Sequence, residues 1–244
     1  MYQTLFNAAL SALSRVAKGR TRLKGVRERN KYDSLPKLIS DHFRCNSEET
    51  HPCRDTLSLA LERLEHRAAT IIETGSSAWG TNSSLLFDSY VNSFGGQFYS
   101  VDIRIQPSVS LRSLCTHNST FFCDDSVHFL KKYVSVNNNA DLVYLDSWDV
   151  NWRDPLPSAL HGFHEFLTIF PTLQANKRSL LLVDDTPFDS LVMTKVQPRH
   201  LNDFERFKEL YGLYPGKGAL IKHFLVCNQI GMEIKHDYQL LWQF

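Results

Sequence analysis

Short apolar segments recur along the chain, at residues 70–73, 98–102, 120–123, 142–146 and 180–184. Longer segments lie between them, with apolar residues at helical spacing, at 83–92, 108–114, 126–134 and 158–170, and again from Leu201 onward. Strands that alternate with helices in this way are typical of a parallel sheet covered on both faces. The pattern therefore predicts an α/β fold with a doubly wound, mostly parallel, Rossmann-like sheet.

The tail adds two further extended segments, residues 232–235 and 238–244. We expect them to form an antiparallel edge, which would make the sheet seven-stranded. Upstream, apolar residues at i, i+3, i+4 and i+7 after Asp55 predict a helix over one face of the sheet. These signals place one α/β domain at residues 55–244.

Residues 1–27 contain six basic residues and no acidic residue, with apolar residues at helical spacing. This composition predicts a basic amphipathic helix, followed up to residue 54 by a polar connector with one short helix around 35–43. Such a helix could pack on the domain, contact a second subunit, resemble a transit peptide or lie on a membrane surface. A peripheral membrane or protein contact through residues 1–27 and a homo-oligomer both stay open.

Composition limits the classes of partner. A chain of 244 residues with 43% hydrophobic content can bury one sizeable core, and a net charge of +1 gives no field that demands nucleic acid. No apolar run approaches the ~20 residues that span a bilayer. The five cysteines are odd in number and form no C-x-x-C pair, which favours free thiols in a reducing compartment and therefore a cytoplasmic protein.

The segment 71–83 is the most informative: an apolar strand ends at Glu73, and Gly75, Ser76 and Gly80 precede a helix start. In a doubly wound sheet this loop lies at the mouth of the ligand crevice, where glycine lets the backbone approach a ligand closely. A tight turn without any ligand is the simpler alternative.

Acidic residues end the next two strands. Asp102 stands where a carboxylate accepts hydrogen bonds from two ribose hydroxyls. Asp124 and Asp125 follow the third strand, where one could accept from an adenine amino group and the other could cap the next helix; either could be only a cap. The absence of G-x-G-x-x-G argues against a dinucleotide pyrophosphate.

Three more carboxylates, Asp146, Asp184 and Asp185, end the fourth and fifth strands. Clustered carboxylates repel unless they share a cation or a proton, so these residues predict a site for Mg²⁺, Mn²⁺ or Ca²⁺. Such a metal could hold a substrate hydroxyl and lower its pKa. The alternative is that Asp184 or Asp185 acts as a base or a helix cap.

His161 follows on the next helical segment and shares a face with Glu165. It could act as a general base or contact the substrate. A solvated helix face is the competing interpretation of the pair.

Together, E-T-G at 73–75, V-D-I at 101–103, D-S-V-x-F-L at 125–130, L-D-S-W-D at 145–149 and V-D-D-T at 183–186 resemble the class I S-adenosylmethionine-dependent methyltransferases. The resemblance covers residues 57–244 and is nearest to the cephalosporin-hydroxylase-like and sugar O-methyltransferases.

The resemblance implies O-methylation of a small-molecule or sugar hydroxyl, with Mg²⁺ as the expected metal. It assigns the Gly75 loop to the methionine part of S-adenosylmethionine, Asp102 to the ribose and Asp124 or Asp125 to the adenine. The negative charge of Glu73 would attract the cationic sulfonium, which gives a reason for Glu73 to lie near the methionine part. It assigns the metal to the acids that end the fourth and fifth strands, with Asp146, Asp184 and His161 as the catalytic candidates.

Some features depart from the group or recur in unrelated proteins. The first glycine loop is looser than acid-x-G-x-G-x-G, and catechol-type enzymes carry asparagine where Asp185 stands. Residues 216–218, Gly-Lys-Gly, also resemble the group and predict a flexible loop near the substrate entrance. The simpler alternative is a common glycine turn around a surface lysine. Two rivals remain: a non-catalytic nucleotide-binding or assembly module, and a nicotinamide-dependent oxidoreductase.

Overall fold

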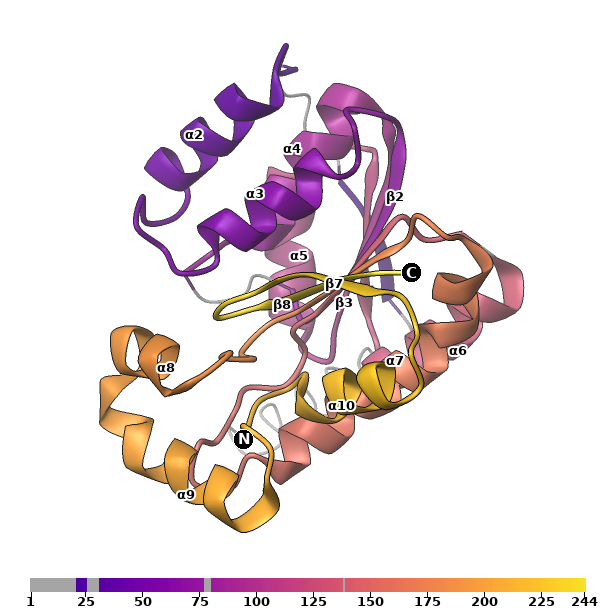
Figure 1. Cartoon of the computed structure of the whole chain (residues 1–244). Helices are drawn as coiled ribbons and strands as arrows, with labels where there is room; N and C mark the ends of the chain where they lie inside the picture. The colour runs from indigo at the N-terminus through magenta and orange to yellow at the C-terminus, as the bar shows by residue number, and fades with distance from the viewer. Residues whose placement is uncertain (1–20, 26–30, 77–79, 138) are drawn as a thin grey trace, which may run out of the picture.

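Eight strands form one sheet in the computed structural model, which describes residues 21–25, 31–76, 80–137 and 139–244 (Figure 1). The strands are β1 (Thr21–Lys24), β2 (Ala69–Thr74), β3 (Gly96–Asp102), β4 (Ser119–Cys123), β5 (Leu142–Leu145), β6 (Leu180–Val183), β7 (Met232–His236) and β8 (Leu240–Gln243). Their order across the sheet is β1-β4-β3-β2-β5-β6-β8-β7.

Strands β2 to β6 are parallel, and β8 and β7 complete one edge in the antiparallel sense. The chain moves outward from β2 to β4, then returns to β5 on the other side of β2 and continues to β6. The strand order therefore reverses between β2 and β5, the position at which doubly wound sheets open a ligand crevice. The seven predicted strands and their antiparallel carboxyl-terminal edge are confirmed, and β1 adds an eighth strand to the sheet.

Ten helical segments accompany these strands in the described part of the chain. They are α2 (Leu35–Cys45), α3 (Arg54–Glu62), α4 (Ser83–Phe94), α5 (Ile105–Leu114), α6 (Ser126–Val136), α7 (Leu156–Ala175), α8 (Ser190–Val196), the 3₁₀ helix η1 (Pro198–His200), α9 (Leu201–Tyr211) and α10 (Ala219–Cys227).

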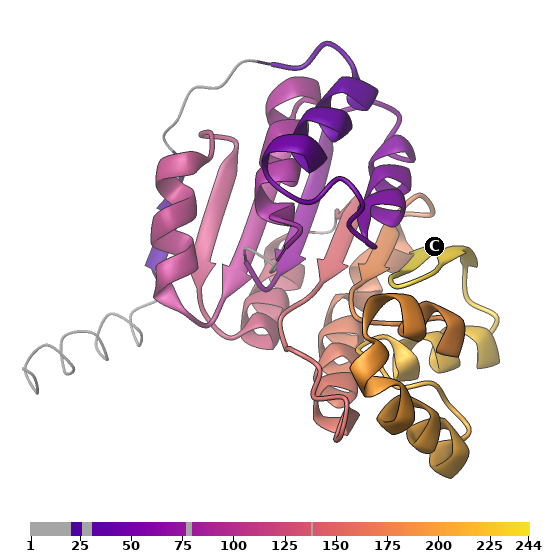
Figure 2. The same cartoon turned by 90° about the vertical axis from the view of Figure 1, so that its left-hand side faces the viewer.

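The central strands are buried on both faces, which explains their continuous apolar character. Successive side chains of a strand point to opposite faces, so Leu142 and Tyr144 of β5 join one core while Val143 and Leu145 join the other. Helices α2, α3 and α4 contribute to the first core, and α6, α7 and α10 contribute to the second (Figures 1 and 2).

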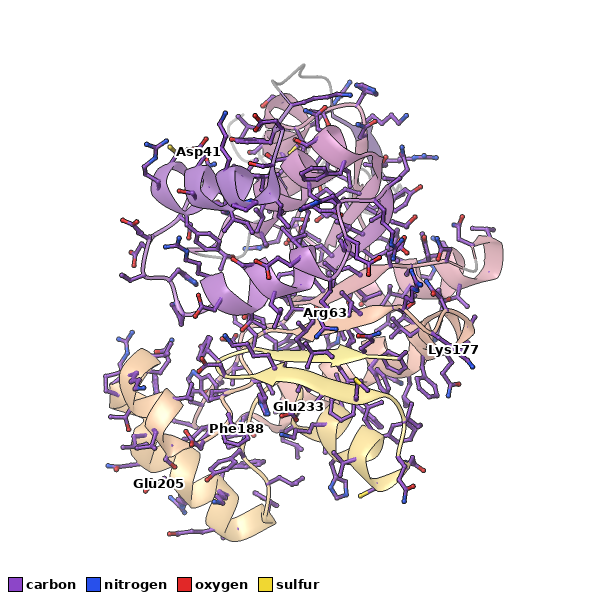
Figure 3. All side chains as sticks on the ribbon, turned by 45° about the horizontal axis from the view of Figure 1, so that its top comes forward. Asp41, Arg63, Lys177, Phe188, Glu205 and Glu233 are labelled. Carbon is purple, nitrogen blue, oxygen red and sulfur yellow. The ribbon has the colours of Figure 1, made fainter. Side chains whose placement is uncertain are left out.

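Helices α8 and α9 form a lobe beyond the carboxyl ends of the parallel strands (Figure 2). The ring of Phe188, which precedes α8, lies 5.1 Å from the ring of His236 on β7 and so links the lobe to the hairpin (Figure 3). The sequence predicts one long helical region from Leu201. The structure divides it at Gly212, whose φ of 71° ends α9 in the left-handed conformation that glycine favours.

Strand β1 pairs antiparallel with β4, in a segment for which the sequence predicts helix. The prediction for residues 21–24 is wrong because the outer edge of β4 offers unpaired backbone groups, and pairing with them outweighs helix propensity. The remainder of the predicted basic helix, residues 1–20, lies outside the described residues.

Two smaller expectations are settled by the structure. All five cysteines are free, with Cys53, Cys115 and Cys123 buried. Within the described ranges, no helix combines the length and the apolar character that crossing a membrane requires.

Candidate active site

A cavity of about 830 Å³ opens at the carboxyl ends of the parallel strands. Six of the residues singled out in the sequence line it: Gly75, Ser76, Asp102, Asp146, Asp184 and Asp185. The loops after β2 and β3 supply the first three, and the loops after β5 and β6 supply the others. One cavity therefore joins the predicted cofactor side to the predicted acid cluster.

The loop after β2 lies close against the start of the loop after β5. Gly75 has φ of +83°, and a Cβ there would overlap the carbonyl oxygen of Asp146. Its N–H donates to Val101 O at 2.8 Å, and the N–H of Ser76 donates to Asp102 Oδ2 at 3.2 Å. Glycine is thus required at position 75 so that the loop can run across the strand ends.

The rest of this loop is attached to the amino-terminal connector. Ser47 Oγ donates to the carbonyl of Gly80 at 2.6 Å, and a Cβ on Gly80 would lie 2.8 Å from His51 Nε2. Gly80 supports the loop from outside the cavity, and residues 77–79 lie outside the described part of the chain.

Glu73 is fully buried beneath the loop and does not line the cavity. Its carboxylate accepts hydrogen bonds from three serine hydroxyls, those of Ser83 (2.6 Å), Ser84 (2.5 Å) and Ser100 (2.6 Å). Burial raises the pKa of Glu73 to about 7, against the opposing effect of these donors. Glu73 therefore fastens β3 and the first turn of α4 to β2, and its place near the methionine part of a cofactor stays a prediction.

Asp102 faces the cavity from the end of β3. Its carboxylate accepts from the backbone N–H of Arg104 at 2.7 Å and from the Arg104 guanidinium at 3.0 and 2.9 Å. The Arg104 side chain is 65% exposed, whereas Asp102 is 4% exposed. Ribose hydroxyls entering from the cavity could replace the guanidinium at this carboxylate.

Asp124 and Asp125 do not line the cavity. Asp125 caps α6 by accepting from the N–H of His128 at 2.9 Å, so the capping alternative is confirmed for this residue. Asp124 accepts from His128 Nδ1 at 2.9 Å and Lys132 Nζ at 3.2 Å. Burial acts to raise the pKa of Asp124, and these two donors outweigh it and hold the pKa below its ordinary value. A contact between Asp124 and an adenine stays a prediction.

The acid cluster is assembled as the sequence predicts: oxygen atoms of Asp146, Asp184 and Asp185 lie within 4.8 Å of one another. Burial raises the pKa of Asp146 and of Asp184 against the opposing effect of the Lys217 ammonium, and the charge of Asp185 raises both further. Neutral donors reach the cluster from the carboxyl-terminal hairpin, with Tyr238 OH 2.6 Å from Asp185 Oδ1 and Gln239 Nε2 2.7 Å from Asp184 Oδ1.

Lys217 also enters this cluster, so the alternative of a glycine turn around a surface lysine does not hold. Its side chain is 3% exposed, and its ammonium pairs with Asp146 Oδ1 and, at 3.1 Å, with Asp185 Oδ2. Carboxylate oxygens are the ligands that Mg²⁺ prefers, so the donor chemistry suits a hard cation. The ammonium already lies between two of the three acids, so the side chains as arranged do not fit a divalent metal beside it.

His161 lies on α7 and is not among the residues that line this cavity. Its Nε2 is 3.1 Å from Ser126 Oγ and 3.6 Å from Glu165 Oε1, and its ring packs on Trp148 with 5.1 Å between centroids. The neighbouring Glu165 carboxylate raises the pKa of His161. The structure therefore places His161 among packing partners, and its role as a base stays a prediction.

Sequence reasoning misses several residues that line or complete the site. The connector before α3 brings His51 and Cys53 to the cavity, where Cys53 Sγ lies 3.5 Å from Asp184 Oδ1. Nothing in the polar composition of this segment indicates such a position. The signal for Lys217 was present in its flanking glycines, which allow close backbone packing.

Comparison with protein-family models gives no match, and comparison with curated proteins gives none either. Solved structures do match. The MycE methyltransferase of the mycinamycin biosynthetic pathway, in complex with Mg, SAH and mycinamycin VI, aligns with a TM-score of 0.55 and 17% identity over 88% of this chain. Another MycE structure, in complex with Mg and SAH, aligns with a TM-score of 0.54 and 18% identity.

This chain spans 55% of the length of MycE. The O-methyltransferase TomG from Streptomyces achromogenes, in complex with SAM, aligns at 14% identity with a TM-score of 0.45, over 88% of this chain and 91% of TomG. The MycE alignments show that the chain has the fold of the class I S-adenosylmethionine-dependent methyltransferases.

Proposed function

We propose that this protein is an S-adenosylmethionine-dependent methyltransferase that methylates a hydroxyl oxygen of a small molecule, in the group of cephalosporin-hydroxylase-like and sugar O-methyltransferases. The observation that carries the proposal is the single cavity that joins Gly75 and Asp102 to the acids after β5 and β6. In this fold the first pair suits an adenosyl cofactor, and the acids suit an acceptor that must lose a proton.

The cofactor is expected along the carboxyl ends of β2 and β3. The ribose would take hydrogen bonds from Asp102, and the methionine part would lie against the backbone of Gly75 and Ser76. The bound sulfonium supplies an activated methyl group, so the tasks left to the protein are to orient the acceptor and to remove its proton.

The acceptor is expected to be polar and to extend beyond the cavity. A neighbouring groove of about 610 Å³ shares His51, Pro52 and Val196 with the cavity, so the two spaces adjoin. Charged side chains line that groove, among them Arg54 and Lys195. A hydroxylated molecule such as a sugar offers hydrogen-bonding groups to match them.

The buried acids are the candidates for accepting the proton of the acceptor. Burial raises the pKa of Asp146 and Asp184, which is the direction that makes a carboxylate a stronger base. A magnesium ion held by the three acids is the alternative predicted from the sequence, and the magnesium in the MycE structures supports it. That alternative requires Lys217 to leave the cluster.

Calorimetric titration with S-adenosylmethionine, S-adenosylhomocysteine and NAD tests the proposal. We expect the first two to bind and NAD not to bind. Asp102→Asn should weaken S-adenosylhomocysteine binding by roughly ten- to a hundredfold, because charge-assisted hydrogen bonds contribute ~1.5–3 kcal/mol.

Asp125→Asn is the matched control, since Asp125 caps α6 outside the cavity, and it should leave the affinity unchanged. Binding of NAD with no response to the methyl donor would favour the oxidoreductase and reject the proposal. Cofactor binding without methyl transfer to any hydroxylated compound would favour the non-catalytic module.

A further inference from the structure

The acids after β5 and β6 carry more negative charge than their neutral hydrogen-bond donors can balance. Gln239 donates to Asp184 and Tyr238 donates to Asp185, but neither donor carries a charge. Carboxylates whose oxygens lie within 4.8 Å repel strongly when they are buried. The cluster therefore needs a cation or a shared proton.

Lys217 supplies that cation from within the chain. Its ammonium bridges Asp146 on the β5 side and Asp185 on the β6 side, which are the same two loops that a bridging metal would join. Burying an ammonium is costly unless it is paired, and this one is paired twice.

The backbone around Lys217 is shaped to bring it there. The N–H of Lys217 donates to the carbonyl of Asp185 at 3.1 Å, and a Cβ on Gly216 would overlap that same carbonyl. On the other side, a Cβ on Gly162 of α7 would lie 2.8 Å from the carbonyl of Lys217. Glycines from two separate elements thus make room for the lysine backbone, which a lysine at the surface does not require.

We infer that the ammonium of Lys217 is the resident cation of this acid cluster and takes the place of a divalent metal. The acceptor hydroxyl would then meet a fixed single positive charge, and methyl transfer would proceed without added metal. This catalytic consequence rests on the proposed function, whereas the charge arrangement can be tested without it.

Titration with Mn²⁺, followed by electron paramagnetic resonance, tests the inference on the full chain. We expect the wild-type protein to show no stoichiometric binding at millimolar Mn²⁺. Lys217→Ala should bind Mn²⁺ about tenfold more tightly or better, because three carboxylates then lack their cation. Adding Asp146→Asn to Lys217→Ala should abolish that gain.

Lys222→Ala is the matched control. Lys222 lies on α10, pairs with Glu233 at 2.8 Å and does not line the cavity, so its loss should leave Mn²⁺ binding at the wild-type level. Lys217→Met, which keeps most of the side-chain length, replaces Lys217→Ala if the alanine variant does not fold.

Tight Mn²⁺ binding by the wild-type protein that Asp146→Asn weakens would overturn the inference. So would a failure of the folded Lys217 variants to bind more Mn²⁺ than the wild-type protein. S-adenosylhomocysteine titration of the same samples separates this inference from the proposed function. If the wild-type protein does not bind S-adenosylhomocysteine, the proposed function fails, whereas the Mn²⁺ result still tests the role of Lys217.

Discussion

Glu73 places an ionisable carboxyl group where no solvent reaches it, with three serine hydroxyls as its hydrogen-bond donors. Burial raises its pKa from 4.5 to about 7, so the folded chain holds this proton at a pH where an unfolded chain has lost it. A raised pKa of this kind makes stability depend on pH in a definite direction.

The free energy of unfolding should fall as the pH rises from about 4.5 through about 7, by about 3 kcal/mol in all, because ~1.4 kcal/mol corresponds to each unit of pKa difference. We expect Glu73→Gln to remove most of this fall, since an amide does not titrate and can still hydrogen-bond to the serines. Urea denaturation across this pH range measures the pH dependence of the free energy of unfolding for both proteins. Glu62→Gln on the exposed side of α3 should keep the wild-type slope, and an equal slope in wild-type and Glu73→Gln proteins would refute the assignment.

Residues at strand ends could be predicted from the sequence, because a carboxylate directly after an apolar strand must lie at the edge of the sheet. Asp102, Asp146, Asp184 and Asp185 were found in this way, and all of them line the cavity. Lys217 could not be predicted from a position at a strand end, because its burial depends on Gly162 and on the loop after β6, which are far from it in the chain.

At the scale of elements, the turn before α10 is the connection that carries Lys217 into the site. It holds Gly216 at a φ of +144°, where L-amino acids are strained, and presses it against the carbonyl of Asp185. The N–H of Gly218 donates to Thr186 Oγ1 at 2.9 Å, so the turn is attached to the loop after β6 at a second point. The loop predicted to be flexible is thus closely packed.

Gly216→Ala should destabilise the protein by about 1–3 kcal/mol, from backbone strain and from the overlap at Asp185, and should displace Lys217. Thermal unfolding and the Mn²⁺ titration described above measure the two effects. Gly212→Ala is the control, since Gly212 also has a positive φ of 71° but nothing lies within 4 Å of its Cβ position. It should cost about 1 kcal/mol and leave metal binding unchanged, whereas equal losses in the two variants would contradict the packing argument.

Most elements follow from hydrophobic spacing, because each strand of the centre is covered on both faces and each covering helix is amphipathic. Prediction from the spacing of apolar residues fails where tertiary contacts decide the conformation. Residues 21–24 pair with β4 despite their helical pattern, and the helices after residue 189 break at turns that only the lobe geometry fixes.

Across the whole molecule, the two edges of the sheet differ. At one edge, β7 belongs to the carboxyl-terminal hairpin, while at the other edge the four residues of β1 cover β4 within the described part of the chain. Strand β4, with the sequence STFFC, is apolar and rich in β-forming residues. Such a strand pairs readily with another chain when its edge is uncovered.

Deletion of residues 1–27 should therefore raise the tendency of the protein to self-associate, while the cofactor cavity is kept. Sedimentation velocity and S-adenosylhomocysteine titration measure the two outcomes. Arg22→Ala retains the backbone pairing of β1 and should remain like the wild-type protein. A truncated protein with an unchanged particle size would contradict this prediction and the wider expectation that residues 1–27 affect assembly or membrane association.

The architecture of the whole molecule could be predicted because alternating strands and helices leave few ways to wind a sheet. The composition of the site could not, since the connector at His51 and the hairpin at Tyr238 reach the cavity from distant parts of the sequence. Contacts of that kind depend on the three-dimensional course of the chain, which periodicity does not encode.

The neutralising partners of the acid cluster are translated after the acids themselves. Asp184 and Asp185 are added to the nascent chain before Lys217, Tyr238 and Gln239, so the end of β6 is made before the residues that allow its charges to be buried. This end of the sheet must therefore stay exposed to solvent in the nascent chain while β2 to β5 assemble. Exclusion of water from the carboxyl ends of these strands is therefore a late event of biosynthesis, which follows synthesis of the hairpin.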